Sequence, residues 1–398
     1  MPNHRNMKSR IRPIGLALPL VAFIVITFLI PLGNMVKESV YDAEVAGALP
    51  STLRLLKDWD GVDLPTEEVF RTLATEIVIL QESRALGKIA NRVNRVISGT
   101  RSVWGKTARR VKDAETDDMT TTMIEIDDRW RDLALWRGIK EAGQRYTPRN
   151  FLHAVDLTKD DDGSIVPAER ERRVYNTLYI RTLQVAITVT LLSLLIGYPI
   201  AYAIAHAPPT LSKILLLCVL VPFWTSLLAR ATSWIVLLQT QGVVNDALVW
   251  FRLVPDEGRL SLIYNMTGTL IAMTQNLLPF AVLPIYAVLS SIPPTYMRAA
   301  ASLGANPMQA FFRVYWPQSL PGVASGCLLV FILSIGFYIT PAIVGGTKGQ
   351  LISNMIAYHI DNNNWGLAAA ISVIVLLSVL LLYVIFDRWV GVDKLKLS

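Results

Sequence analysis

The sequence predicts an all-α membrane protein with six transmembrane helices and a large, mainly helical insert outside the membrane between the first two. The first observation is composition: of 398 residues, 52% are hydrophobic and 17% charged, and the mean hydropathy of +0.41 is high for a soluble domain. The second is charge placement. Residues 37–177 contain 23 of the 38 basic and 25 of the 31 acidic residues, so that region alone resembles a soluble domain.

Six apolar segments are long enough to cross a bilayer, because a spanning helix needs about 20 mostly apolar residues. They are residues 14–36, 183–205, 211–238, 266–289, 320–338 and 367–389, the last five forming a membrane core at 178–389. A cleaved signal peptide is the alternative for the first segment. No small-residue cleavage site follows it promptly, so we expect an uncleaved helix.

Positive charges at both ends of the chain predict its orientation. The N-terminal tail, residues 1–13, carries Arg5, Lys8, Arg10 and Arg12 without an acid, and the C-terminal tail, 390–398, carries Lys394 and Lys396 after Arg388. The positive-inside rule puts both tails in the cytoplasm. Loops 206–213 and 290–319 are then cytoplasmic, and the insert 37–177 is periplasmic.

The net charge of +7 divides into −2 for the insert and +9 for the remainder, since 15 basic and 6 acidic residues lie outside residues 37–177. The basic balance therefore indicates positive flanks on membrane helices rather than nucleic-acid binding. Within the insert, two stretches show helical periodicity: Val69, Phe70, Leu73, Ile77 and Leu80 after the start signal at 65–68, and Met123, Ile126, Trp130, Leu133, Trp136 and Ile139. Its mixed-sign charges favour a solvated scaffold, with partner recognition as the alternative.

Two motifs in the insert resemble ligand-binding loops. Residues 99–107, GTRSVWGKT, resemble a phosphate-binding loop, but five residues separate the glycines where the motif has four, and no strand precedes them. We therefore reject it. Residues 158–169 place Asp160, Asp162 and Glu169 at ligand positions of a calcium-binding loop, but Thr158 replaces the first aspartate. The alternative is an Asp-Gly surface turn.

No catalytic or metal-binding constellation is evident in the sequence. The four histidines, His4, His153, His206 and His359, are dispersed without zinc spacing. Cys218 and Cys327 lie inside apolar runs and are expected to be small buried hydrophobes rather than a disulfide or metal pair.

Helix-breaking residues concentrate in four of the six predicted spans. They are Gly197 and Pro199, Pro222, Pro279 and Pro284, and Gly336 and Pro341. Broken helices free backbone groups that other protein groups or a water-filled path must satisfy. A packing kink is the alternative, but so many breaks favour a translocation path.

An ionisable residue, Arg230, lies deep in the third segment, where burying a charge is costly. It either lines the path or extends to the outer interface. Trp224, Thr225, Asn276 and Tyr338 are the other polar or amphipathic candidates for the path.

Residues 298–317, RAAASLGANPMQAFFRVYWP, resemble the cytoplasmic loop by which ABC importer permeases couple to their ATPase. The matching residues are Ala299, Ala300, Leu303, Gly304, Ala305, Phe311, Val314 and Pro317. The alanine run is a good helix former, and Gly304 allows a tight turn before a second short helix from Pro307. Arg298 departs from the family, which usually has Glu there, so that acid's contact is missing.

The runs GYPIAYAIA, VPFWTSLLARATSWIVLL and ITPAIVGG are similar to the spermidine/putrescine-type branch, and the resemblance extends over residues 175–389. It implies six transmembrane helices of the importer-permease type in a bacterial inner membrane. It also implies a second permease subunit, two ATPase subunits and a periplasmic substrate-binding protein as partners. The solute would be a small organic compound, polyamine-like or a related nitrogenous compound.

The resemblance further implies that ATP and Mg²⁺ are bound by the partner ATPase, and that this chain binds no cofactor and is not an enzyme. The predicted spans offer almost no acids, so selectivity for a polycation would reside in the binding protein. Two alternatives remain. An ion-driven secondary transporter should show intramembrane acids or paired halves, which are not evident. A membrane-anchored sensor or scaffold would leave the loop at 299–317 without a role.

Overall fold

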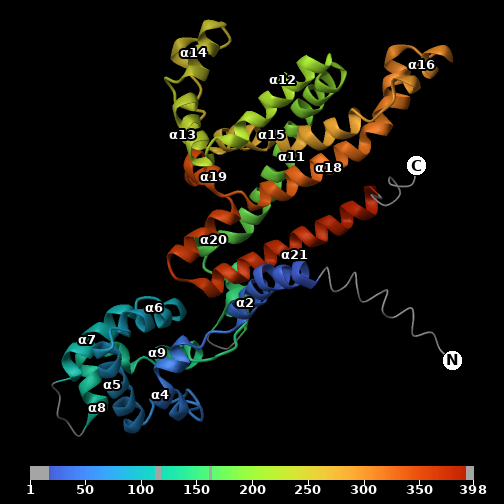
Figure 1. The fold of residues 1–398 in the computed structure, drawn as a ribbon. Helices are drawn as coiled ribbons and strands as arrows, with labels where there is room; N and C mark the ends of the chain where they lie inside the picture. The colour runs from blue at the N-terminus through green and yellow to red at the C-terminus, as the bar shows by residue number, and fades with distance from the viewer. Residues whose placement is uncertain (1–17, 113–117, 161–163, 391–398) are drawn as a thin grey trace, which may run out of the picture. The chain divides into compact units, whose positions relative to one another are not determined.

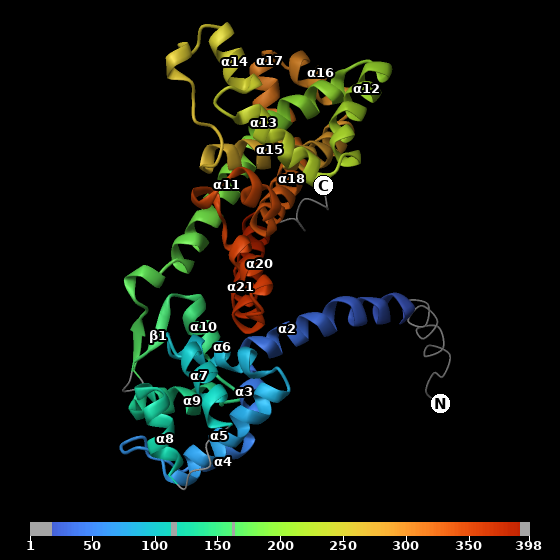
Figure 2. The ribbon, with the colours of Figure 1, turned by 90° about the vertical axis from the view of Figure 1, so that its left-hand side faces the viewer.

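The computed structural model describes residues 18–112, 118–160 and 164–390, and it forms two compact units. The chain up to Ala168, together with Trp365–Ala370, makes the first unit, which contains the predicted insert. Glu169–Asn364, together with the chain from Ile371 onward, makes the second unit. Figures 1 and 2 show both units as ribbons.

The first unit consists of an apolar helix followed by short helices and one β-hairpin (Figure 2). The apolar helix, Leu18–Val40, includes a π-helical segment, Val25–Leu29, and ends in α2 (Ile30–Val40). The short elements are α3 (Glu44–Ala48), α4 (Pro50–Leu55), α5 (Glu67–Glu82), α6 (Leu86–Val96), α7 (Arg101–Val111), α8 (Met119–Ile126), α9 (Leu133–Ala142), α10 (Arg149–Ala154), β1 (Leu157–Lys159) and β2 (Ile165–Pro167).

Three tryptophans and a phenylalanine form the centre of the insert core: Trp104, Trp130, Trp136 and Phe70. Phe70 on α5 contacts Trp136 with ring centroids 4.6 Å apart, and Trp136 lies 5.5 Å from Trp130. The indole N–H of Trp130 donates to the Thr107 hydroxyl over 2.9 Å. All five residues of the first predicted periodic stretch are buried on α5, which confirms that prediction. The core gives the insert a hydrophobic centre of its own.

The second predicted stretch is helical, but it forms three pieces instead of one. An aspartate begins each piece: Asp118 accepts from the Thr121 N–H over 3.0 Å, Asp127 from Arg129 over 3.3 Å, and Asp132 from Ala134 over 2.9 Å. Such a carboxylate satisfies amides that a new helix leaves unpaired, so it starts a helix wherever it lies. Ile126 and Leu133, which flank these breaks, are only half-buried.

The second unit contains long apolar helices joined by short ones (Figure 1). They are α11 (Tyr175–His206), α12 (Pro209–Leu220), α13 (Leu227–Leu238), α14 (Val243–Trp250), α15 (Met266–Leu289), α16 (Pro294–Ser302), α17 (Pro307–Ala310), α18 (Trp316–Gly336), α19 (Ile339–Val344), α20 (Ile352–Asp361) and α21 (Trp365–Val390), whose first residues belong to the other unit.

Helices α11, α15 and α18 pack against one another and form the centre of this unit. Two glycines one turn apart on α18 allow a close approach to α15. A Cβ at Gly322 would lie 3.0 Å from the carbonyl oxygen of Pro284, and one at Gly326 would lie 2.9 Å from that of Ala281. Small residues at this spacing let membrane helices pack backbone to backbone.

The described residues contain five helices long and apolar enough to cross a membrane, or six if one bent pair counts as a span. The bent pair, Pro209–Trp224 with Leu227–Trp250, covers the third predicted segment, 211–238, and confirms the interruption predicted there. The chain turns by 99° between the two parts. Pro222 lies in the 3₁₀ turn at the break, where its ring and missing N–H prevent α12 from continuing.

The other predicted breaks divide into two groups. Pro199, Pro279 and Pro284 remain inside α11 and α15, so they do not end these helices, contrary to our expectation of broken spans. Gly336 does end α18, and the chain turns before α19. Proline is tolerated inside membrane helices when neighbouring groups satisfy the freed backbone.

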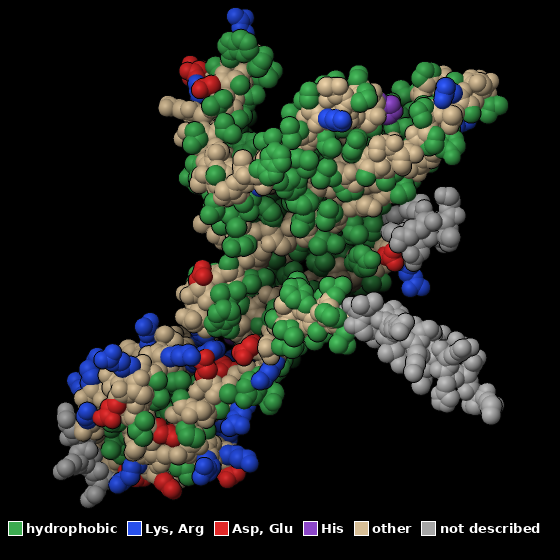
Figure 3. Space-filling view, in the orientation of Figure 1, with side chains coloured by type: hydrophobic (Ala, Val, Ile, Leu, Met, Phe, Trp, Pro, Cys, Tyr) green, Lys and Arg blue, Asp and Glu red, His purple; other side chains and the backbone are tan. Residues whose placement is uncertain are grey.

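The charge division predicted from the sequence is visible on the surface. Figure 3 shows charged side chains gathered over the helices of the insert, whereas the visible face of the long apolar helices is largely hydrophobic. Leu191, Leu195 and Leu381 are 60%, 71% and 62% exposed, as expected for side chains that face lipid. Cys218, expected to be buried, is exposed on α12, and Cys327 on α18 is half-buried.

Candidate functional site

The loop after α15 folds as a helical hairpin whose turn depends on Gly304. Helix α16 ends at Ser302, and Gly304 adopts φ +86, a conformation that side chains with a Cβ rarely accept. The Gly304 N–H donates to the Ala301 carbonyl over 3.0 Å, and the Ala305 N–H to the Ala300 carbonyl over 3.1 Å. These paired bonds are a Schellman motif, which satisfies the last carbonyls of a helix.

The second arm of the hairpin begins with a capping box. The Asn306 side chain accepts from the Gln309 N–H over 2.8 Å, and the Gln309 side chain accepts from the Asn306 N–H over 3.2 Å. Helix α17 then continues through a π-helical segment, Phe311–Tyr315, into α18. The two-arm helical hairpin expected from the sequence is therefore present, with defined ends on both arms.

The hairpin exposes large apolar side chains. Tyr296, Leu303, Met308 and Phe312 are 49%, 89%, 66% and 58% exposed. Exposed apolar side chains gathered on one short segment are typical of a docking surface when the segment does not face lipid. Arg298 is exposed beside them, and its guanidinium makes no hydrogen bond or ion pair with any residue that the structure describes, although its carbonyl accepts from the Ser302 hydroxyl over 3.0 Å.

The remaining residues of the predicted loop divide by burial. Ala299 and Pro317 are exposed, whereas Ala300, Ala305, Phe311 and Val314 are half-buried. The half-buried group holds the hairpin to its own unit, and the exposed group is available to a partner.

Beneath the hairpin, Phe311 joins a cluster of aromatic rings that the sequence reasoning missed. Tyr198, Tyr202 and His206 on α11 contact Phe311 and Tyr315. The signal was present in the sequence, because a spacing of four puts all three α11 residues on one face. It was hidden by the uniformly apolar character of the segment around them.

Among the predicted path residues, Asn276 lies deepest. It is 3% exposed on α15, and its side-chain amide donates to the Thr340 hydroxyl of α19 over 3.2 Å. Its side-chain oxygen is buried without a hydrogen-bond partner. A buried amide oxygen without a partner is rare in proteins and can accept a hydrogen bond from a passing solute or water.

Tyr338 occupies the turn between α18 and α19, and two side chains of α20 satisfy the backbone there. The Ser353 hydroxyl donates to the Phe337 carbonyl over 2.7 Å, and the Asn354 amide donates to the Tyr338 carbonyl over 2.8 Å. Sequence reasoning found the break but not these donors. Tyr338 itself is 46% exposed.

The other path candidates lie at the bend between α12 and α13. Trp224 is 74% exposed, and the Thr225 hydroxyl donates locally to the Pro222 carbonyl over 2.9 Å. Arg230 is half-buried on α13, and its Nε is buried without a partner. Helix α13 packs against α19, which carries Thr340. No hydrogen bond within the described residues links Trp224, Thr225 or Arg230 to Asn276, so the shared path stays a prediction.

The calcium candidate forms a β-hairpin. Lys159 lies opposite Ile165, and the Asp160 N–H donates to the Ser164 carbonyl over 2.9 Å. Asp160 therefore lies at the turn end and Glu169 beyond the opposite end, whereas a calcium loop converges both on one ion. Asp162 lies outside the described residues. Gly163 lies outside them as well, so both the calcium site and the alternative Asp-Gly turn stay predictions.

The rejected phosphate-loop match, residues 99–107, is helical from its third residue onward, because α7 begins at Arg101, and Trp104 and Thr107 are buried in the insert core. No group of three or more potential metal ligands occurs among the described residues. His359 lies 2.8 Å from the Tyr175 hydroxyl through its Nε2. His153 ends α10 in the insert, and His4 lies outside the described residues.

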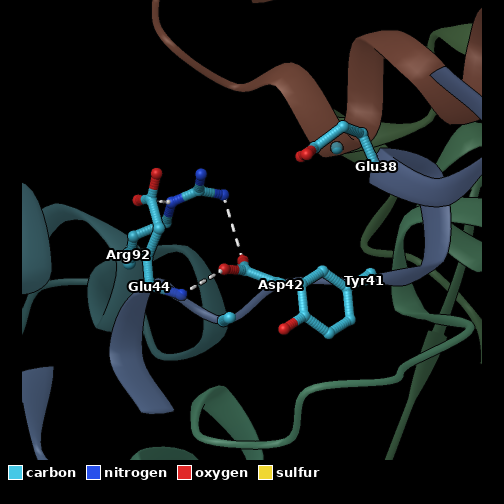
Figure 4. A pocket seen from close by; sticks show the side chains of 7 residues that line it. Glu38, Tyr41, Asp42, Glu44 and Arg92 are labelled. Carbon is cyan, nitrogen blue, oxygen red and sulfur yellow. Dashed lines mark hydrogen bonds and ion pairs between the residues drawn. The ribbon is translucent and has the colours of Figure 1, made fainter. Parts of the chain in front are cut away.

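The first unit contains a cavity of about 300 Å³ beside the start of α3 (Figure 4). Arg92 occupies one wall, where its Nη1 lies 3.1 Å from Asp42 and its Nε 2.8 Å from Glu44. Burial raises the pKa of Glu44, but its bonds with Arg92 and Lys88 outweigh that effect and hold the pKa below the ordinary value. Two of the three wall carboxylates are therefore already paired, and we assign this cavity a structural role.

Comparison with known proteins shows that about half of this chain matches one family. A family model described as the inner membrane component of binding-protein-dependent transport systems matches residues 193–392. This region contains the hairpin and every path candidate, and the insert lies outside it.

Three curated relatives and one solved structure illustrate the similarity. The spermidine/putrescine transport system permease protein PotB of Salmonella typhimurium strain SL1344 is 31% identical over 252 residues, which cover 61% of this chain and 87% of the relative. PotB of Haemophilus influenzae is 32% identical over 253 residues, covering 60% and 86%. The inner membrane ABC transporter permease protein YdcU of Escherichia coli is 30% identical over 225 residues, covering 54% and 71%. A structure of the MetNI methionine ABC transporter aligns with 54% of this chain and 94% of its own, at a TM-score of 0.43 and 17% identity.

Proposed function

The chain belongs to the family of inner membrane components of binding-protein-dependent transport systems, and from that premise we propose that it conducts a polyamine-like or related nitrogenous solute and couples to a separate ATPase through its hairpin at 290–319. It is a multi-pass permease component of an ABC importer. Family membership favours this function over an ion-driven secondary transporter or a membrane-anchored sensor.

The observation that carries the coupling proposal is the exposed apolar surface of the hairpin. Leu303 is 89% exposed at a turn whose geometry is defined by Gly304. A short amphipathic helix of this kind binds in a groove of a partner protein. Arg298, where the family usually has Glu, would pair with an acidic side chain of the ATPase, because the charge at this position is reversed.

The proposed partners are a second permease subunit, two ATPase subunits that bind ATP and Mg²⁺, and a periplasmic substrate-binding protein. The family description supports the binding protein, since it names transport that depends on one. This chain would bind no cofactor itself. The names of the PotB relatives support the choice of solute, and the binding protein would supply selectivity for it.

The proposed orientation places the tails 1–13 and 390–398 in the cytoplasm, the helix at 14–36 and the core at 178–389 in the membrane, and the insert 37–177 in the periplasm. The positive flanks of the first and last spans support it. The hairpin at 290–319 would then face the cytoplasm, where an ATPase has access to ATP.

The test co-expresses the chain with the ATPase, second permease and binding protein of its own gene cluster. We expect Leu303→Asp and Gly304→Trp to abolish co-purification of the ATPase and ATP-dependent uptake of labelled spermidine or putrescine in proteoliposomes. The new carboxylate at position 303 would lose its water in the partner's groove without gaining a group of opposite charge, which is costly. A tryptophan at position 304 would block the groove and strain the turn, because a residue with a Cβ rarely adopts a positive φ.

Gly304→Asn is the matched control, because asparagine accepts a positive φ better than other residues with a Cβ. It should retain co-purification and most of the uptake. Full retention of the ATPase by Leu303→Asp would contradict the coupling role. Uptake of a different solute with intact co-purification would reject only the choice of a polyamine.

A further inference from the structure

The aromatic cluster beneath the hairpin joins two chain segments that are far apart in sequence. On α11, Tyr198, Tyr202 and His206 follow one another at a spacing of four and share a face. Across from them, Phe311 and Tyr315 belong to the π-helical segment that connects the hairpin to α18. The cluster therefore lies where the hairpin meets the apolar helices of its unit.

The contacts between the two faces are continuous. Tyr202 has its ring centroid 6.2 Å from that of Phe311 and 5.5 Å from that of Tyr315. His206 stacks on Tyr202 at 4.1 Å and lies 5.5 Å from Tyr315. Tyr198 lies 6.4 Å from Phe311. Aromatic pairs at these separations attract each other beyond the burial of their area.

A further contact extends the cluster into α18. Tyr198 has its ring centroid 5.0 Å from that of Trp316, and its hydroxyl donates to the buried Ser319 hydroxyl over 3.2 Å. The connection thus continues from the hairpin, through the π-helical segment, to the first turn of α18.

Ring packing, rather than hydrogen bonding, holds the centre of the cluster. Tyr315 is 3% exposed, yet its hydroxyl is buried without a hydrogen-bond partner. Leaving that hydroxyl unpaired costs free energy, so the position of Tyr315 is determined by its ring. A π-helical turn at the same place is itself a feature often found at functional sites.

The cluster gives the hairpin a second connection to the rest of its unit. Through the chain, the hairpin is joined directly to α15 and α18, and the rings connect it to α11, which is distant in sequence. Helix α11 in turn packs closely on α15, where a Cβ at Gly197 would lie 3.4 Å from Ala281 and Val282. Densely packed rings transmit displacement because they cannot be compressed.

We propose that the Tyr198, Tyr202 and His206 face of α11 is a mechanical link that makes α11 move together with α18 when the hairpin is displaced. The proposal rests on the proposed function, in which an ATPase displaces the hairpin. The three residues are positioning residues: they contact neither solute nor ATP, and they determine how hairpin motion is divided among the helices.

The test uses the complete importer in proteoliposomes and measures uptake and ATP hydrolysis together. Tyr202→Leu and Tyr315→Leu should leave ATPase co-purification and the rate of hydrolysis unchanged, while solute uptake per ATP falls about tenfold, within the range that changes along a coupled network produce. Tyr202→Phe and Tyr315→Phe keep the rings and should retain coupling. Tyr383→Leu removes an exposed ring from α21, outside the cluster, and is the matched control.

A distance measurement tests the shared motion without relying on activity. Spin labels at Leu195 on α11 and Leu329 on α18, both exposed, are introduced after replacement of Cys218 and Cys327. In the otherwise unchanged complex, the distance between the labels should stay constant between the ATP-free and ATP-bound states. In the complex that carries Tyr202→Leu, the distance between the labels should change between the ATP-free and ATP-bound states.

The outcomes separate this proposal from the proposed function. Normal uptake per ATP in Tyr202→Leu, or a label distance that behaves alike in both proteins, would overturn the link. Loss of ATPase co-purification in Tyr202→Leu would also overturn it, because the cluster would then only support the fold of the hairpin. Failure of the unchanged chain to bind any ATPase would reject the proposed function itself.

Discussion

Single carboxylates of α5 hold the starts of two other helices in the insert. Glu76, 8% exposed, accepts from the Ser51 N–H over 2.8 Å at the start of α4 and from the Thr52 hydroxyl over 2.6 Å. Glu67 accepts from the N–H groups of Met119 and Thr120 at the start of α8, over 2.7 and 2.8 Å. Each carboxylate accepts hydrogen bonds from amides that the start of a helix leaves unpaired. Its negative charge also interacts favourably with the positive end of the helix dipole.

Glu67 should make the start of α8 sensitive to acid. Burial raises its pKa, but the Thr120 hydroxyl and the two N–H groups outweigh that and lower the pKa below its ordinary value. A lowered pKa means that the stabilisation is complete above the ordinary pKa of glutamate, about 4.3, and is lost as the pH falls through the lower folded value. Hydrogen exchange at 118–122 in the full chain should therefore quicken as the pH falls below that value, after correction for the intrinsic exchange rate.

Glu67→Gln should remove this pH dependence and lower the local stability at neutral pH by about 1 kcal/mol. The cost is small for a charged hydrogen bond because Glu67 is partly exposed and solvent screens its charge. The neighbouring exposed Glu68→Gln is the control and should leave both unchanged. A pH dependence that persists in Glu67→Gln would assign the effect to another carboxylate.

At the scale of elements, the ends of the helices decide where the candidate site lies. Gly304 and the capping box at Asn306 stop and restart the hairpin helices. Gly336 ends α18, and α20 supplies the donors for the carbonyls of the turn. Proline alone is a poor guide here, because Pro279 and Pro284 stay inside α15. A break forms where the tertiary structure supplies partners for the freed groups.

The double variant Ser353→Ala with Asn354→Ala should loosen the turn between α18 and α19. The Phe337 carbonyl loses the Ser353 donor and the Tyr338 carbonyl keeps the Ala342 N–H but loses the Asn354 amide, which costs about 1–3 kcal/mol. Hydrogen exchange at 337–342 should quicken and solute uptake should fall. Ser378→Ala on α21, whose hydroxyl bonds only within its own helix to the Ile374 carbonyl at 2.8 Å, is the matched control. Unchanged exchange at the turn would show that other groups hold it.

At the scale of the whole molecule, two units with separate hydrophobic cores share one chain. The family match at 193–392 falls within the second unit, apart from Trp365–Ala370, and the insert has its own core around Trp104, Trp130 and Trp136. Separate cores allow one unit to open without the other. The charged residues gather on the insert because only the insert needs a solvated surface.

Trp136→Ala should therefore destabilise the insert alone. Removing a fully buried tryptophan leaves a cavity and costs about 3–5 kcal/mol. Hydrogen exchange should quicken throughout α5 to α9 and stay unchanged in α15 and α18. Ile79→Ala removes an exposed side chain of α5 and is the control. Faster exchange in α15 after Trp136→Ala would mean that the two units fold as one.

The sequence by itself determined the class of the molecule, the membrane segments, the helical insert and the hairpin with its turn at Gly304. These features depend on composition, periodicity and local backbone preference, which are properties of a single segment and do not require contacts with the rest of the fold. Only the tertiary structure decided that the third span, with its predicted break at Pro222, bends as sharply as 99°, that Asp127 and Asp132 restart helices, and that Ser353 and Asn354 close a break. It alone brought Tyr198, Tyr202 and His206 against Phe311 and Tyr315. Contacts between residues more than a hundred positions apart depend on how helices pack, and uniformly apolar spans carry little pattern that could predict it.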